Sequence, residues 1–237
     1  LTAAGGVDRL NRATGTFEHY SHSETDPNSL SHDVIRAAIE DQSGTIWVGT
    51  MSGLNKYNRE DDNFARYQPS KTKPNCLSYD EVTFIYESPK EPGILWVSTG
   101  EVQNLSEGGG LNRFDVRTEK FTHFNLKPLK MKSRSGNVVG QIHEDKDGIF
   151  WVCSTQGLVR FDRDTGKFDY YLPDPNNIES YSNIIVSITE DIQGALWIRT
   201  QALDGIYRFD KENGYFQNFR HDPTDPSSLS NDLIMSI

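Results

Sequence analysis

Short apolar runs alternate with turn-forming residues along this chain, and the spacing typical of helices is absent. Residues 34–39 form a largely apolar run with β-branched side chains, and the sequence DQSG that follows it supplies a turn. The runs TIWVGT, LNKYN and FARYQ come next, separated by SG and by the acidic stretch REDDN. Runs rich in Val, Ile, Trp, Tyr and Phe, bounded by Gly, Asp and Asn, are typical of β-strands. The pattern therefore predicts four strands between residues 34 and 68.

This unit recurs along the chain. The sequences DQSGTIWVGT, EPGILWVST, DKDGIFWVCST and DIQGALWIRT each carry a tryptophan three residues after a glycine. These tryptophans are separated by 49, 55 and 46 residues: Trp47, Trp96, Trp151 and Trp197. Periods of this size are typical of repeat architectures.

Two further motifs recur in step with the tryptophans. One reads GVDRLN, GLNKYN, GLNRFD, GLVRFD and GIYRFD, and a phenylalanine lies eleven residues after the glycine of every copy. The other precedes each tryptophan as VIRAAIED, EVTFIYES, VVGQIHED and IIVSITED, with a partial copy, LIMSI, at the end of the chain. Every full repeat therefore predicts four short strands.

The second strand of each repeat identifies the architecture. In TIWVGT, Ile46 and Val48 point to one face and Trp47 points to the other. A strand that is apolar on both faces must be covered on both faces, as in four-stranded sheets packed face to face around an axis. The predicted fold class is all-β: a β-propeller of four-stranded antiparallel blades. A solenoid is disfavoured, because solenoid repeats are usually shorter.

The repeats set the expected domain organisation, a single β-propeller domain or fragment over residues 1–237. The predicted repeats are 1–30 (partial), 31–77, 78–134, 135–180, 181–227 and 228–237 (partial). The first copy starts after its tryptophan position and the last stops before it. Either the two ends pair to close a ring of about five blades, or the chain is an excerpt of a larger propeller, for example a seven-bladed one. The excerpt is favoured, because a closed domain would hardly discard its own tryptophan strand.

Charge and composition narrow the choice of partners. The formal net charge of −10 opposes binding to nucleic acid or to an anionic membrane surface. The basic run Lys127–Arg134 is interpreted as a solvated loop. Cys76 and Cys153 have no metal-ligand spacing and are expected to be free thiols. No apolar run approaches the roughly 18 residues that a membrane helix needs, so this segment is not expected to insert into a membrane.

The run NSLSHDVIRAAIEDQSGTIWVGTMSGLNKYN resembles the two-component regulator propeller repeat, and the similarity extends over essentially the whole chain. The third repeat departs from the pattern with ESPKEPG in its turn, and the fifth repeat has WIRT in place of WVGT. The resemblance implies the extracytoplasmic sensor region of a bacterial signalling protein. Such a region lies in the periplasm, within an inner-membrane parent that has a cytoplasmic output module. The resemblance also implies an oligosaccharide ligand, and partners that are neighbouring domains of the parent. A second copy of the chain is the partner expected if the chain is a dimerisation platform.

Residues that recur in every repeat are expected to serve the blade itself. We therefore interpret the tryptophans as core wedges rather than as platforms for sugars. Asp41, Asp145 and Asp191 are expected to accept hydrogen bonds from backbone amides in their hairpin turns. A catalytic pair of carboxylates is disfavoured, because these acids recur once per blade and glycoside hydrolysis needs two carboxyl groups within about 10 Å.

Residues that break the repeat are the candidates for a ligand site. The connection between the second and third strands lengthens to TGEVQNLSEGGG in the third repeat and to TQALDG in the fifth. Inserted loops on a rigid scaffold often bind ligands. These loops supply five polar candidates: Glu101, Gln103, Asn104, Gln201 and Asp204. The alternative interpretation is that the insertions are decorative or contact a partner.

A second set of candidates leads into the first strand of each repeat. Equivalent positions of the repeats form a column, and the column just before the repeated Asp or Asn holds a different residue in each copy: His32, Tyr79, Gly136, Ser182 and Asn231. These residues are expected to surround the mouth of the central channel. His32 and Tyr79 are the best polar and aromatic pair of this column. The equally weighted alternative is that they cap strands in water.

The sequence therefore predicts a sensory, ligand-binding propeller whose ligand is a glycan, with no catalytic residues, no cofactor and no metal. A propeller lyase or glycosidase is the enzymatic alternative. Arg36 is the only arginine on the predicted first strands, which argues against a sialidase-like arginine cluster. A platform for protein interaction or dimerisation is the third hypothesis, and it predicts no affinity for small molecules.

Overall fold

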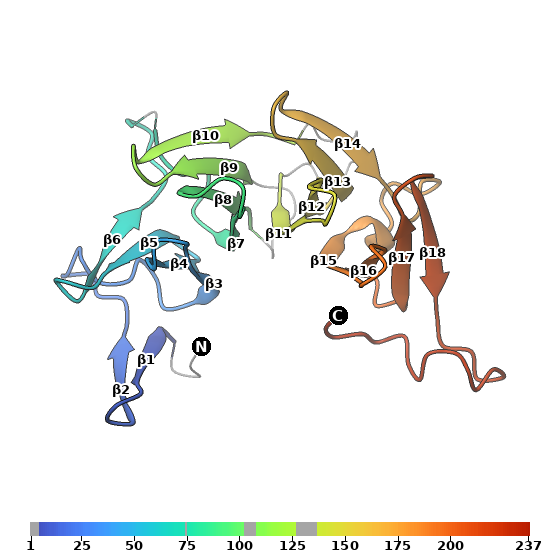
Figure 1. Cartoon of the computed structure of the whole chain (residues 1–237), viewed down its shortest axis with the longest axis horizontal. Helices are drawn as coiled ribbons and strands as arrows, with labels where there is room; N and C mark the ends of the chain where they lie inside the picture. The colour runs from blue at the N-terminus through green and yellow to red at the C-terminus, as the bar shows by residue number, and fades with distance from the viewer. Residues whose placement is uncertain (1–4, 74, 102–107, 127–136) are drawn as a thin grey trace. The chain divides into compact units, whose positions relative to one another are not determined.

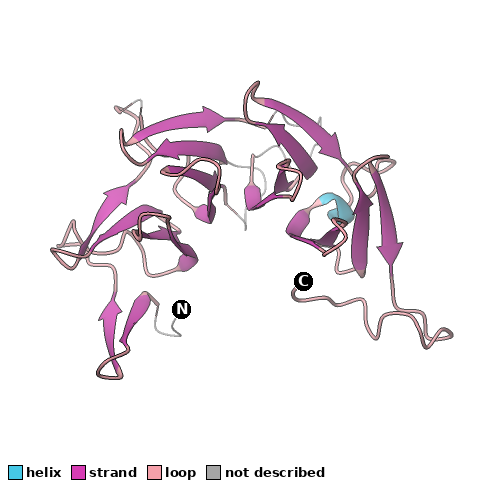
Figure 2. Cartoon of the chain, in the orientation of Figure 1, coloured by secondary structure: helices cyan, strands magenta, loops and turns pink. Residues whose placement is uncertain are grey.

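A computed structural model describes residues 5–73, 75–101, 108–126 and 137–237 of the chain (Figure 1). Almost all of the regular structure is β-strand (Figure 2). The described strands form four four-stranded sheets and one two-stranded sheet. Residue contacts divide the chain into two compact units, residues 1–102 with 108–125 and residues 103–107 with 126–237, and each unit is described by itself.

The first unit contains three sheets. The two-stranded sheet consists of β1 (Val7–Asn11) and β2 (Thr16–Tyr20). The next sheet consists of β3 (Ile35–Glu40), β4 (Ile46–Thr50), β5 (Gly53–Asn58) and β6 (Asn63–Tyr67). The last consists of β7 (Val82–Glu87), β8 (Ile94–Thr99), β9 (Gly110–Asp115) and β10 (Lys120–Phe124).

The second unit contains two sheets and one short 3-10 helix, η1 (Tyr181–Asn183). One sheet consists of β11 (Val139–Glu144), β12 (Phe150–Ser154), β13 (Gly157–Asp162) and β14 (Lys167–Tyr171). The other consists of β15 (Ile185–Glu190), β16 (Leu196–Thr200), β17 (Ile206–Asp210) and β18 (Tyr215–Phe219).

Each four-stranded sheet is an antiparallel meander of four consecutive strands. The predicted strands of residues 34–68 are confirmed to within one residue at each end. A solenoid would build sheets from successive repeats, so one complete sheet per repeat excludes that alternative. One feature escaped prediction: the register between the first two strands shifts near the start of every four-stranded sheet, for example between Ile35 and Ala37. Such bulges bend a strand and increase its twist.

One tryptophan side chain in each unit fills the space between two sheets, as predicted. Trp47 is fully buried, and its ring centroid lies 5.9 Å from Tyr67 of its own sheet and 5.6 Å from Phe114 of the following sheet. In the second unit Trp151 lies in the same way, 5.9 Å from Tyr171 and 5.4 Å from Phe209. The repeated aromatic positions therefore form the contacts that join one sheet to the next.

The aspartates of the hairpin turns accept the predicted backbone hydrogen bonds. Oδ1 of Asp41 accepts from the amides of Ser43 and Thr45, each at 2.9 Å, and Oδ2 accepts from the indole nitrogen of Trp47 at 2.7 Å. Asp145 and Asp191 have the same three bonds. Burial raises the pKa of Asp41, but hydrogen bonds from Ser43 and Trp47 outweigh it and hold the pKa below its usual value. Each aspartate thus fixes both its turn and its tryptophan.

The repeat with the irregular turn keeps the indole bond by another route. The sequence ESPKEPG has no aspartate at that position, and Oε2 of Glu91 accepts from the indole nitrogen of Trp96 at 3.3 Å. A longer side chain therefore replaces the aspartate.

Candidate functional site

Two irregular segments of the first unit meet at Tyr79. Its hydroxyl donates to Oε2 of Glu101, at the start of the eight-residue insertion, at 3.1 Å. Gly108, where the described chain resumes after the insertion, lies against the same ring with φ of 57°. A Cβ atom at Gly108 would lie 2.0 Å from Cε2 of Tyr79, so only glycine fits there. Both ends of the insertion are therefore packed around one tyrosine.

A partly buried ion pair lies two residues further along the chain. Glu81 is only 3% exposed, and its Oε1 atom lies 2.9 Å from Nε of Arg36 on the preceding sheet. The corresponding residues of the other repeats are apolar: Val34, Val138, Ile184 and Leu233. Sequence reasoning missed Glu81, although a carboxylate in an otherwise apolar column is a detectable signal.

An open pocket of about 770 Å³ lies beside Gly108, in the loop that leads to Tyr79. It is lined by Pro69, Ser70, Lys71, Thr72, Lys73, Cys76, Leu77, Ser78, Asp80, Gly108, Gly109, His123 and Asn125. Most of the lining comes from one loop, residues 69–78, which connects β6 to β7.

This loop has the same backbone support as its counterparts. Sγ of Cys76 accepts a hydrogen bond from the amide of Ser70 at 3.2 Å. The equivalent bond of the preceding copy runs from the amide of Ser23 to Oγ of Ser29, at 2.8 Å. Nε2 of His123 donates to the carbonyl of Cys76 at 2.7 Å. In the preceding copy an arginine, Arg66, donates to the carbonyl of Ser29. The loop that lines the pocket therefore keeps the hydrogen-bonding pattern of the preceding copy and differs from it in its side chains.

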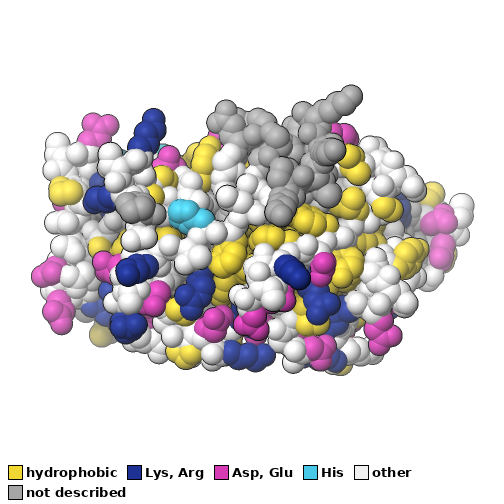
Figure 3. Space-filling view, turned by 90° about the horizontal axis from the view of Figure 1, so that it is seen from above, with side chains coloured by type: hydrophobic (Ala, Val, Ile, Leu, Met, Phe, Trp, Pro, Cys, Tyr) yellow, Lys and Arg dark blue, Asp and Glu magenta, His cyan; other side chains and the backbone are white. Residues whose placement is uncertain are grey.

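The altered side chains reverse the charge of the loop. Lys71 and Lys73 occupy the positions of Glu24 and Asp26 in the first copy. The last copy has Asp225 at the position of Lys73. Acidic and basic side chains of the described residues are otherwise mixed over the face shown in Figure 3. A local pair of lysines in a chain of net charge −10 favours an anionic group in the pocket.

The two insertions share one hydrogen-bonding scheme. In the second unit the hydroxyl of Ser182 donates to Oδ2 of Asp204 at 2.8 Å. Ser182 occupies the column of Tyr79, and Asp204 lies in the same connection as Glu101. Asp204 also accepts from Thr200 at 2.9 Å and from Tyr207 at 2.6 Å. Burial, together with the bond to Asp204, raises the pKa of Tyr207 to about 12. Asp204 therefore holds its own loop.

The remaining predicted residues lie as follows. Nδ1 of His32 accepts from the amide of Val34 at 2.9 Å, which is the capping contact of the alternative interpretation. Gln201 is exposed, and its backbone amide donates to Ile184 at 2.9 Å. Gln103 and Asn104 lie outside the described residues, as do Gly136 and the basic run 127–134. Among the candidates with described contacts, the structure brings together Tyr79 with Glu101 and Ser182 with Asp204.

The two cysteines are expected to differ sharply in reactivity. Cys76 is partly exposed at the pocket, whereas Cys153 is fully buried and burial raises the pKa of its thiol. We expect a thiol reagent to modify one cysteine per native chain and two after denaturation, because the thiolate is the reacting form and needs access. The Cys76→Ser variant, which introduces the serine of the first and last loops (Ser29 and Ser228), should show no native reaction. Modification of Cys153 in the native chain would contradict this.

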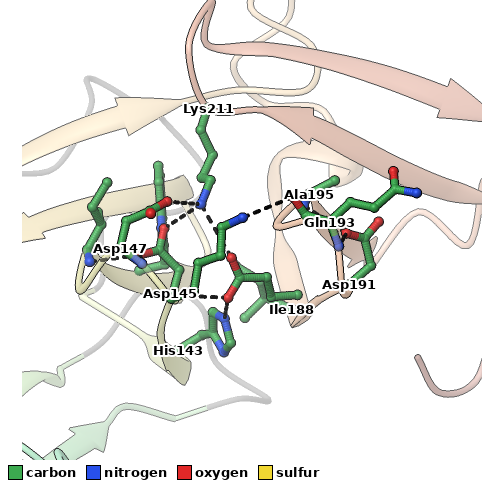
Figure 4. Close-up of polar contacts among 12 residues, drawn as sticks. His143, Asp145, Asp147, Ile188, Asp191, Gln193, Ala195 and Lys211 are labelled. Atoms are coloured by element: carbon green, nitrogen blue, oxygen red, sulfur yellow. Dashed lines mark hydrogen bonds and ion pairs between the residues drawn. The ribbon is translucent and has the colours of Figure 1, made fainter.

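A second polar cluster links the two sheets of the second unit (Figure 4). Nζ of Lys211, in the turn after β17, lies 2.9 Å from Asp145, 3.0 Å from Asp147 and 3.4 Å from Glu190. Oε2 of Glu190 also accepts from the amide of Lys146 at 2.9 Å. Every carboxylate in the cluster has a protein partner, which indicates a structural role.

Neither a metal site nor a membrane-spanning helix is found among the described residues. No group of three or more His, Cys, Asp and Glu side chains in this part of the chain is placed to hold a metal ion. None of its helices is long and apolar enough to cross a membrane.

Comparisons with known proteins agree with these observations. Residues 29–52 match the family model described as two component regulator propeller, which confirms the resemblance of that repeat. No curated protein matches significantly.

Solved structures match nearly the whole chain. The extracellular domain of a protein described as a hybrid two component system of B. thetaiotaomicron is 24% identical, with a TM-score of 0.70, over 97% of this chain and 27% of that chain. A second such domain from the same organism is 20% identical, with a TM-score of 0.65, over 91% of this chain and 28% of that one. Virginiamycin B lyase from Staphylococcus aureus is 18% identical, with a TM-score of 0.59, over 93% and 64% of the two chains.

At these identities the likeness establishes the fold. The predicted β-propeller of four-stranded blades is confirmed. The chain spans only 27% and 28% of the length of the two extracellular domains. The same fold also occurs in an enzyme, the lyase.

Proposed function

We propose that this chain is part of the extracytoplasmic sensory propeller of a bacterial signalling protein, and that its ligand is an acidic glycan bound in the pocket of loop 69–78. The family match at residues 29–52 and the likeness to extracellular domains of two-component proteins support the sensory role. In this proposal the segment lies in the periplasm, and the parent protein is anchored in the inner membrane.

The observation that carries the proposal is the charge reversal of a loop whose internal hydrogen bonds recur in the first copy. Lys71 and Lys73 replace acids while Cys76 and His123 preserve the loop's internal bonds. Hydroxyl groups of Ser70, Thr72 and Ser78 line the same pocket. Lysines suit the carboxylate or sulfate of an acidic sugar, and hydroxyl groups can donate to and accept from sugar hydroxyls.

Tyr79 and Glu101 extend this arrangement toward the insertion. The bond between them orders the start of the inserted loop at the edge of the pocket. A ligand that bridged loop 69–78 and the insertion would change the position of one relative to the other. Signalling through neighbouring domains requires that the ligand bind one of two such arrangements more tightly.

Binding of charged and neutral oligosaccharides by the 237-residue chain tests the proposal. Oligogalacturonate and neutral galactan fragments of matched length would be compared by calorimetry. We expect the acidic ligand to bind at least ~10-fold more tightly at low salt and to lose that advantage as salt screens the lysines. The double variant Lys71→Glu/Lys73→Asp, which restores the residues of the first copy, should weaken binding of the acidic ligand about 10-fold and leave the fold intact.

The control is Lys120→Glu, which changes an exposed lysine outside the pocket. It should leave binding unchanged. Equal affinities for both glycans, or equal losses from the control, would contradict the proposed site. Conversion of the glycan into unsaturated or hydrolysed products would favour the lyase or glycosidase alternative. Absence of glycan binding, with self-association of the chain, would favour an interaction platform.

A further inference from the structure

The loop that lines the pocket lacks a residue on which two of its counterparts depend. Pro69 occupies the position of His22 in the first copy and of His221 in the last copy. In the first copy the amide of His22 donates to Oδ1 of Asp33 at 2.6 Å. His221 and Asp232 form the same bond at 2.6 Å in the last copy. Proline has no amide hydrogen, so this loop cannot form the bond.

The carboxylate that loses this donor is Asp80. It occupies the position of Asp33, is exposed and lines the pocket. Among the described residues, its carboxylate forms no hydrogen bond and no ion pair, although Lys71 and Lys73 line the same pocket. The pocket therefore holds one carboxylate and two ammonium groups that are not in direct contact with one another.

The same replacement removes a donor from a second acceptor, a backbone carbonyl. In the first copy Nδ1 of His22 donates to the carbonyl of Leu30 at 2.7 Å, and Arg66 donates to it at 3.0 Å. The equivalent residue is Leu77, which is 1% exposed and lines the pocket. Pro69 has no ring donor, and the histidine that replaces the arginine bonds to another carbonyl. In the described part of the chain the carbonyl of Leu77 therefore accepts no hydrogen bond, which is rare for a buried backbone group.

The chemistry of these two acceptors indicates what a ligand must supply. In the first and last copies one histidine serves both acceptors, with its amide and with its ring nitrogen. A protonated amino group has three N–H donors and a positive charge, so it can donate to a carboxylate and a carbonyl together. The bond to the carboxylate is charge-assisted and therefore stronger than a bond between neutral groups. A hydroxyl group has a single donor and no charge.

We propose that the ligand of this pocket carries an amino group that donates to Asp80 and to the carbonyl of Leu77, while its anionic group binds at Lys71 and Lys73. This inference rests on the proposed acidic-glycan site, and it narrows the ligand to a zwitterionic amino sugar. Pro69 determines the specificity, because it leaves both acceptors without the donors that a histidine supplies in the first and last copies.

Three sulfated monosaccharides test this inference on the 237-residue chain. Glucosamine 6-sulfate carries a protonated amino group, N-acetylglucosamine 6-sulfate carries a neutral amide in its place, and glucose 6-sulfate carries a hydroxyl group. Titrations followed by the NMR signals of each sugar give the three affinities. We expect glucosamine 6-sulfate to bind at least ~10-fold more tightly than the other two, because it alone can form a charge-assisted bond with Asp80.

The variant Asp80→Asn removes the negative charge and keeps the shape of the side chain. An asparagine stands at this position in the second unit, where Asn183 accepts from the amide of Asp174 at 2.8 Å, so the substitution suits the fold. We expect the variant to bind all three sugars equally. Asp33→Asn is the matched control, because the carboxylate of Asp33 is already bonded to its own loop, and it should leave the preference unchanged.

The variant Pro69→His introduces the histidine of the first and last copies. Its amide and ring can donate to Asp80 and to the carbonyl of Leu77, so it should weaken binding of glucosamine 6-sulfate at least ~10-fold. A higher urea midpoint would show that these bonds form. Circular dichroism would establish that all three variants are folded.

The possible failures separate this inference from the function on which it rests. Equal affinities for the three sugars, or a preference for glucosamine 6-sulfate that survives Asp80→Asn or is lost equally in Asp33→Asn, would overturn the inference and leave the acidic-glycan site standing. Absence of binding to all three sugars by a chain that binds oligogalacturonate would do the same. Absence of binding to oligogalacturonate as well would overturn the proposed function and this inference together.

Discussion

Replacement of Trp47 by alanine is expected to lower the free energy of unfolding by about 4 kcal/mol, because large-to-small changes at fully buried aromatic residues cost this much. Trp47 is 0% exposed and joins two sheets through Tyr67 and Phe114. The substitution also removes the donor that satisfies Oδ2 of Asp41. Urea denaturation followed by circular dichroism measures the loss.

Trp197→Ala is the matched control for this prediction. Trp197 has the same hydrogen bond, to Asp191 at 2.8 Å, but its side chain is only partly buried. We expect a loss of about 2 kcal/mol, since less apolar area and a smaller cavity are involved. Equal losses for the two variants would show that the hydrogen bond, rather than the packing between sheets, determines the contribution of these tryptophans.

The repeat made most of this architecture predictable from the sequence. Strands, buried tryptophans and turn aspartates recur, so each repeat gives separate evidence for the same local structure. The hydrogen bond from Trp47 to Asp41 was missed, because sequence spacing does not show that one carboxylate oxygen accepts from the turn and the other accepts from the indole. The bulges were missed for a related reason: they change the strand register without a distinctive residue.

The candidate site was predictable only in part. The rule that a residue outside the repeat serves a ligand found Tyr79 and Glu101, which the structure joins. Asp204, the candidate of the other insertion, accepts hydrogen bonds from Ser182 of η1 and from Thr200 and Tyr207 of its own sheet, because an inserted loop must satisfy its own polar groups. The charge reversal at Lys71 and Lys73 became visible only when the loops were aligned through their structural contacts.

Replacement of Lys211 by methionine is expected to cost about 3 kcal/mol at neutral pH, because removing one partner leaves a buried charge uncompensated. Asp145 is 0% exposed at its side chain, Glu190 is 11% exposed, and Lys211 itself is 17% exposed. Arg59→Met is the matched control, since Arg59 follows β5 as Lys211 follows β17. Its pair with Glu40 is 62% and 58% exposed, so its loss should change stability little.

The pH dependence distinguishes an electrostatic loss from a packing loss. Burial raises the pKa of Asp145, but bonds from Trp151 and Lys211 outweigh it and hold the pKa below its usual value. The contribution of this carboxylate is therefore present above about pH 4, its unfolded pKa, and is lost as pH falls through the lower folded value. Burial lowers the pKa of Lys211, but its hydrogen bonds to Asp145 and Asp147 outweigh it and raise the pKa, so the lysine's contribution is retained up to alkaline pH.

The difference in stability between the native chain and Lys211→Met should thus be constant from about pH 6 to pH 9 and should shrink below about pH 4. In the variant, the carboxylate of Asp145 has lost the hydrogen bond from Lys211 that helps to lower its pKa, so it is protonated at a higher pH than in the native chain. Urea midpoints measured across this range give the difference directly. A loss that stays the same down to pH 3 would assign the role of Lys211 to packing of its aliphatic chain between the two sheets instead of to its charge.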